Sequence, residues 1–156
     1  MAPASLVGVF VSCFGLTILS AIVPWVNAEV ILLSLAALVD SPLALVVLVI
    51  VATAGQMVGK CVVYWTGRRS GRLHSPRVAD ALERWRHRLA KHPSNAVTLV
   101  LVSSIVGIPP FYPVTLAAGA LGVDFWRFLV AGTVGRLVRF GALAFVPHLV
   151  RGAVWM

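Results

Sequence analysis

Long apolar stretches, separated by short polar breaks, run along most of the chain. Residues 5–23 carry no charged side chain, residues 43–66 carry only Lys60, and residues 125–146 form a third long stretch. A helix needs roughly 20 apolar residues to cross the hydrocarbon of a bilayer, so a chain of this length holds about four or five membrane segments. The pattern predicts an all-α integral membrane protein.

Two further apolar stretches, residues 23–39 and 105–121, are interrupted by proline near their start. The prolines are Pro24 in the first and Pro109, Pro110 and Pro113 in the second. Residues 30–39 would form a helix of only about 15 Å, too short to cross a bilayer. Three prolines in residues 109–113 should exclude a regular helix there, with the helix resuming over 114–121. We therefore predict two re-entrant hairpins, each followed by a transmembrane helix; the alternative for the first is an ordinary span that ends at Pro24.

The two interrupted stretches are also similar in sequence. Ser34-Leu-Ala-Ala37 recurs as Thr115-Leu-Ala-Ala118, and Val51-Ala-Thr-Ala-Gly55 recurs as Ala131-Gly-Thr-Val-Gly135. Similarity at a nearly fixed offset indicates an internal repeat, and paired interrupted segments are typical of transporters, although Ala and Leu are common enough for chance similarity. We predict one membrane domain over residues 1–156, with an inverted repeat of about 5–66 and 94–148 joined by a linker over 67–92.

Composition and charge support a membrane protein and argue against a nucleic-acid-binding one. Hydrophobic residues make up 60% of the chain, and the net charge is +8. Eight of the thirteen Lys and Arg lie in residues 68–91, next to membrane segments, which predicts that this segment is cytoplasmic. Its apolar residues follow one helical stripe, so we expect a basic amphipathic helix on the surface of the cytoplasmic membrane. The orientation of the termini stays open.

Four ionisable residues lie inside apolar sequence: Glu29, Lys60, Arg136 and Arg139. A charge at the bilayer centre costs about 2.5–3.5 kcal/mol on insertion scales. We therefore expect Glu29 to pair with Arg136 or Arg139, and Lys60 to extend towards the interface. Alternatively, the two arginines bind carbonyl groups freed by broken helices or extend to the far face. Asp40 and Asp124 are expected to be helix caps.

The candidate site follows from these charges. Two guanidinium groups suit a phosphate, and a carboxylate inside the membrane is a natural proton carrier. The predicted substrate-binding residues are Glu29, Arg136, Arg139, Asn27 and Tyr112. The predicted tip-shaping residues are Pro24, Pro109, Pro110 and Pro113, and the predicted packing residues are Gly55, Gly59, Gly119 and Gly135. No catalytic or metal-binding pattern is present, so we expect no enzyme and no cofactor beyond a coupled proton.

Three motifs resemble the DedA family, the bacterial branch of the VTT (SNARE-associated) domain superfamily. They are Pro24-Trp-Val-Asn-Ala-Glu29, then Gly55-x-x-x-Gly59 followed by Tyr64-Trp-Thr-Gly67-Arg68, and Gly107-Ile-Pro-Pro110 followed by Ala118-Gly119 and Phe125-Trp-Arg-Phe128. The resemblance implies two re-entrant hairpins in inverted repeat and lipid translocation, with undecaprenyl phosphate as the best-attested substrate and with proton coupling. Family members carry arginines around the second proline tip, whereas residues 103–111 contain none; Arg136 and Arg139 are candidates to replace them. Compared with the family, we also expect this chain to lack a further C-terminal helix.

The sequence thus predicts a transporter that moves an anionic lipid headgroup, such as undecaprenyl or another polyprenyl phosphate, with membrane lipids as its partners. The alternatives are a phospholipid scramblase, a proton-coupled exporter of small solutes, and a scaffold that recruits partners through its basic segment. The oligomeric state stays open, a homodimer being one option.

Overall fold

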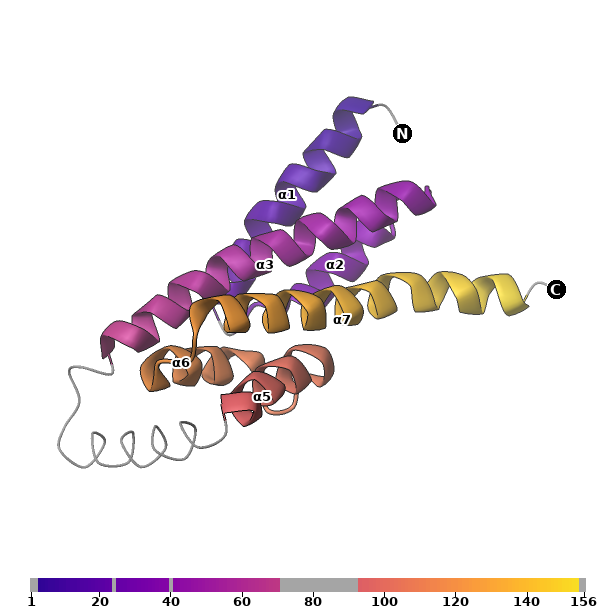
Figure 1. The fold of residues 1–156 in the computed structure, drawn as a ribbon. Coiled ribbons are helices and arrows are strands. Elements are labelled where there is room, and N and C mark those ends of the chain that lie inside the picture. The colour runs from indigo at the N-terminus through magenta and orange to yellow at the C-terminus, as the bar shows by residue number, and fades with distance from the viewer. Residues whose placement is uncertain (1–2, 24, 40, 71–92, 155–156) are drawn as a thin grey trace. The chain divides into compact units, whose positions relative to one another are not determined.

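A computed structural model describes residues 3–23, 25–39, 41–70 and 93–154. All the elements that it describes are α-helices (Figure 1). They are α1 (Pro3–Ile22), α2 (Ala28–Ala36), α3 (Pro42–Ser70), α5 (Pro93–Val106), α6 (Phe111–Leu121) and α7 (Phe125–Val154). The predicted all-α class is confirmed. Pro24, Asp40 and the predicted amphipathic helix lie outside the described residues.

The helix lengths separate two kinds of element. Within α3 and α7, Pro42–Arg69 and Phe125–Phe145 are long and apolar enough to cross a membrane. By contrast, α2 has 9 residues and α6 has 11, so they reach only about 14 and 16 Å. Helix α1 has 20 residues, about 30 Å, a length that also suits a full span. Length alone is therefore compatible with both predictions for the first hairpin.

The start of α6 differs from the prediction. The helix begins at Phe111 rather than after Pro113, with Pro110 at its N-cap position and Pro113 in its first turn. The first turn of a helix has backbone N–H groups without intrahelical partners, so a proline there removes no helical hydrogen bond. The three prolines are not equivalent, because the position of each relative to the helix start decides its effect. At the other end, α6 stops at Gly122, whose φ of 74° is left-handed.

The described chain divides into two compact units. Unit 1 comprises Met1–Gly59 and Arg136–Met156, and unit 2 comprises Lys60–Gly135. Unit 1 therefore contains α1, α2, the first part of α3 and the second part of α7. Unit 2 contains α5, α6, the second part of α3 and the first part of α7. Each unit combines one pair of contacting helices, α1 with α2 or α5 with α6, with segments of both long helices.

The core of unit 1 forms where α1, α2 and α3 approach closely. Leu32 and Leu48 are fully buried in it, together with Phe140 of α7. A Cβ atom at Gly55 would lie 2.7 Å from the backbone oxygen of Phe14, and one at Gly59 would lie 2.7 Å from that of Ile18. Glycine at both positions allows the backbones of α3 and α1 to come into contact, as small residues do in membrane helix pairs.

The core of unit 2 is aromatic. Tyr64 of α3 is fully buried and stacks on Phe128 of α7, with 5.0 Å between the ring centroids. Its hydroxyl donates to the backbone oxygen of Val123 at 2.5 Å, so its polar atom is satisfied inside the core. Helix α6 packs against this segment of α3 at Gly119, where a Cβ atom would collide with the backbone oxygen of Tyr64.

Candidate functional site

The first part of the site is the start of α2. Asn27 is the N-cap residue of this helix, and its Oδ1 accepts a hydrogen bond from the backbone N–H of Glu29 at 2.8 Å. This cap ends the turn after α1 and fixes Glu29 in the first turn of α2. A carboxylate is favoured there because the unpaired N–H groups give the helix start a partial positive charge. Asn27, predicted to bind substrate, has a backbone-capping contact in this structure.

Glu29 forms an ion pair with Arg139 of α7. Arg139 Nε donates to Glu29 Oε1 at 2.6 Å, and Arg139 Nη2 contacts the same oxygen. The side chains of Arg139 and Glu29 are 21% and 28% exposed. Of the two partners that the sequence offered for Glu29, the structure selects Arg139. Neither side chain is fully buried.

Arg136 lies one helical turn before Arg139. Arg136 is 9% exposed, and its guanidinium carbon lies 5.5 Å from the centroid of the Phe140 ring. Arg136 also interacts electrostatically with both Arg139 and Glu29. The cluster of Glu29, Arg136 and Arg139, which we call the charged cluster, therefore combines two cations with one anion.

Lys60 of α3 is the first charged residue of unit 2, and the expectation that it reaches the interface is wrong. Lys60 is only 3% exposed. The Nζ atom lies 5.0 Å from the ring centroid of Tyr112 and 5.7 Å from that of Phe111. These distances are in the range of cation–π interactions. Its position near the basic end of a membrane helix suggested snorkelling, and sequence alone gave no sign that α6 would cover it with aromatic rings.

The predicted tip and packing residues of unit 2 lie in the α5–α6 hairpin and where the helices of this unit contact one another. The second tip, residues 107–110 between α5 and α6, is held by Ser103, whose hydroxyl donates to the backbone oxygen of Pro109 at 2.6 Å. Tyr112 and Pro113 follow in the first turn of α6. At Gly135 a Cβ atom would collide with the side chain of Ser104, so this glycine permits close contact between α7 and α5. Among the residues that the structure describes, no group of three or more His, Cys, Asp or Glu could hold a metal ion.

The features described so far define a class of protein. Two helices that are long and apolar enough to cross a membrane carry buried or half-buried cations, which are rare in membrane segments unless they have a partner or a function. The chain is thus a helical membrane protein. The family model of the VTT domain matches residues 23–149, and the chain belongs to this family, which includes the DedA proteins. No curated protein and no solved structure matches it.

Proposed function

We propose that this protein moves an anionic lipid headgroup, namely a polyprenyl phosphate such as undecaprenyl phosphate, across the cytoplasmic membrane with proton coupling. The observation that carries the proposal is the charged cluster. Glu29 is paired with Arg139, and Arg136 lies one helical turn before Arg139. Membership of a membrane family supports a substrate from the bilayer, and two neighbouring guanidinium groups suit the oxygens of a phosphate.

The geometry suggests how a proton and a phosphate would exchange. Glu29 and a phosphate compete for the same donors on Arg139. Protonation of Glu29 removes its negative charge and releases Arg139, which then joins Arg136 in binding the phosphate. Loss of the proton restores the Glu29–Arg139 pair and expels the phosphate by competition and like-charge repulsion. In this scheme the ion pair is the resting state, and the two hairpins are re-entrant elements of an inverted repeat.

The first test is transbilayer movement of undecaprenyl phosphate in proteoliposomes containing the wild type, Glu29→Gln or Arg139→Gln. Both variants remove one partner of the pair, and each should slow transport by roughly tenfold or more, the usual effect of losing a charged hydrogen-bonding group from a site. Arg127→Gln is the matched control, because Arg127 is an exposed arginine of the same helix. It should transport like the wild type.

The pH dependence of the same assay tests the role of the proton. Wild-type transport should respond to a pH gradient, whereas any residual transport by Glu29→Gln should not, because its amide cannot exchange a proton. Thermal unfolding in detergent checks that each variant is folded. A wild type that moves lipophilic cations but no polyprenyl phosphate would replace this proposal with a small-solute exporter. Normal transport by folded Glu29→Gln and Arg139→Gln would remove the charged cluster from the mechanism.

A further inference from the structure

A buried polar contact joins α1 and α3 in unit 1, apart from the charged cluster. Gln56 of α3 is 3% exposed and Ser20 of α1 is 6% exposed, and Gln56 Nε2 donates to Ser20 Oγ at 2.7 Å. Ser20 Oγ in turn donates to the backbone oxygen of Thr17 at 2.9 Å. In sequence Gln56 lies between Gly55 and Gly59, the glycines that bring α3 against α1. The amide is therefore held at the close contact of these two helices.

The oxygen of this amide has no protein partner. Gln56 Oε1 is buried and accepts no hydrogen bond from any residue that the structure describes. Exchanging the oxygen and the nitrogen of the amide would not change this balance. Oε1 would then face Ser20, and Nε2 would take the unsatisfied place. In either orientation, one polar atom of Gln56 needs a partner that the described part of the chain does not supply.

The position of Gln56 along α3 separates it from bulk water. It lies midway between Pro42 and Arg69, the ends of the segment of α3 that is long enough to cross a membrane. At 1.5 Å per residue, each end of this segment is about 20 Å away along the helix. Hydrocarbon offers no hydrogen bonds at such a depth, so a buried amide oxygen there is costly unless another group donates to it.

The groups around Gln56 restrict what this partner is. Thr17 Oγ1 donates to the backbone oxygen of Cys13 at 2.7 Å, and it lies where a Cβ atom at Gly55 would collide with it. Thr17 and Ser20 thus both use their hydroxyl protons within α1, and each oxygen keeps a lone pair that accepts a hydrogen bond. The contact offers neutral acceptors only. A small neutral molecule with two donors fits such a set, whereas a cation would bring a charge without a counter-ion.

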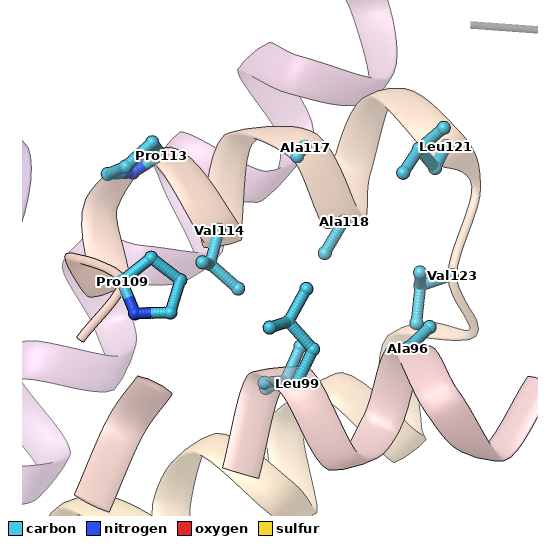
Figure 2. A pocket seen from close by; sticks show the side chains of 10 residues that line it. Ala96, Leu99, Pro109, Pro113, Val114, Ala117, Ala118, Leu121 and Val123 are labelled. Carbon is cyan, nitrogen blue, oxygen red and sulfur yellow. The ribbon is translucent and has the colours of Figure 1, made fainter. Parts of the chain in front are cut away.

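The apolar groove of unit 2 is the opposite case. It lies between α5 and α6, has a volume of about 230 Å³ and is lined only by Ala, Val, Leu and Pro. Figure 2 shows Leu99 of α5 facing Val114 and Ala118 of α6 across this groove. Its lining gives water no hydrogen-bonding side chain, and space alone does not make a water site. The contact between Gln56 and Ser20 has the polar groups that the groove lacks.

We propose that Gln56, Ser20 and Thr17 bind a water molecule between α1 and α3. The water donates to Gln56 Oε1 and to one of the two hydroxyl oxygens of α1. Buried waters in proteins characteristically satisfy polar groups in this way. The site is separate from the charged cluster and needs no substrate, so it stands whether or not the protein transports a lipid.

The composition of the chain makes this site directly observable, because Gln56 is its only glutamine. Cell-free synthesis of the full-length protein with glutamine isotope-labelled at Cδ and Nε2 gives one labelled side chain. Solid-state NMR of proteoliposomes then measures the transfer of magnetisation from water protons to this side chain. In the wild type the transfer should build up severalfold faster than at the methyl groups of Leu32 and Leu48, measured in a leucine-labelled sample. Both leucines are fully buried in the apolar core of the same unit.

Matched serine variants test which groups hold the water. Ser20→Ala removes the hydroxyl that orients the amide and should slow the transfer to Gln56 severalfold. Thr17→Val removes the second hydroxyl with little change of shape and should slow it as well. Ser12→Ala is the control, because Ser12 is an exposed serine of the same helix, and it should leave the transfer unchanged. Thermal unfolding in detergent checks that each variant is folded.

The wild-type measurement decides the proposal even if a variant fails to fold. Transfer to Gln56 as slow as to Leu32 and Leu48 would overturn the water site. Unchanged transfer in both folded Ser20→Ala and folded Thr17→Val would overturn its assignment to the contact between α1 and α3. A Gln56 signal that shifts as the sodium concentration is raised would show a cation in the site and overturn water as its occupant.

Discussion

Units 1 and 2 stabilise a buried cation in different ways. In unit 1, Arg139 is paired with the carboxylate of Glu29, and Arg136 lies beside both and against Phe140. In unit 2, Lys60 lies beside the rings of Phe111 and Tyr112. Unit 1 thus places a counter-ion beside its cations, whereas unit 2 places aromatic rings beside its cation.

Helix packing, by contrast, follows the same principle in both units, because glycine lets two helices come into close contact. Substitution of these glycines should have the largest effect on stability. Gly119→Ala places a methyl group on the backbone oxygen of Tyr64 in unit 2, and Gly55→Ala places one against α1 in unit 1. Each should lower the free energy of unfolding by about 1–3 kcal/mol, because backbone atoms cannot yield as a flexible side chain can. Denaturant titration in detergent micelles measures this loss.

Gly141→Ala is the control for both glycine variants. A Cβ atom at Gly141 of α7 would have no neighbour within 4 Å, so alanine should be neutral or should stabilise the helix by up to about 1 kcal/mol. If Gly119→Ala or Gly55→Ala is as stable as Gly141→Ala, the helices of that unit are not in close contact.

The next effect concerns the ion pair of unit 1. A double-mutant cycle of Glu29→Gln and Arg139→Gln should give a coupling energy of about 1–2 kcal/mol, since the side chains touch and are mostly shielded from water. The same unfolding titration in detergent provides the measurement. A coupling energy near zero would contradict a direct contact between the two side chains.

Unit 2 provides the counterpart. A double-mutant cycle of Lys60→Met and Tyr112→Leu should give a coupling energy of about 0.5–2 kcal/mol, the range for cation–π pairs. Denaturant titration in detergent micelles measures it. A coupling energy near zero would show that Tyr112 does not stabilise the ammonium group of Lys60.

Loss of a helix cap should have the smallest effect on stability, and one cap from each unit can be compared. Asn27 caps α2, and Asp124 caps α7 by accepting from the backbone N–H of Arg127 at 2.9 Å. Asn27→Ala and Asp124→Ala should each cost about 1 kcal/mol of unfolding free energy. Asn27→Ala should in addition weaken the Glu29–Arg139 coupling, since the cap fixes the backbone of Glu29. An equal coupling in Asn27→Ala and the wild type would show that the ion pair needs no such positioning.

Most helices were predictable because apolar runs and glycine spacing are local signals. The cap at Asp124 was predicted from the similar places of Asp40 and Asp124 in the two halves, and the structure confirms it. The two candidate partners of Glu29 were also predictable, because Arg136 and Arg139 lie in apolar sequence and need a negative charge nearby. The choice of Arg139 depends on how α2 meets α7, which is a tertiary property. Lys60 was misjudged for the same reason, because only packing of α6 on α3 reveals the rings that cover it.

The short helices of the two hairpins have a consequence for water. In the proposed re-entrant arrangement, α2 and α6 end inside the bilayer, and the first N–H groups and last C=O groups of each helix lack helical partners. Hydrocarbon cannot satisfy such groups, so they persist at that depth only beside protein or water. Glu29 lies in the first turn of α2, at one of these ends. The hairpin would then admit the water molecules through which Glu29 exchanges its proton, without a relay of further acidic side chains.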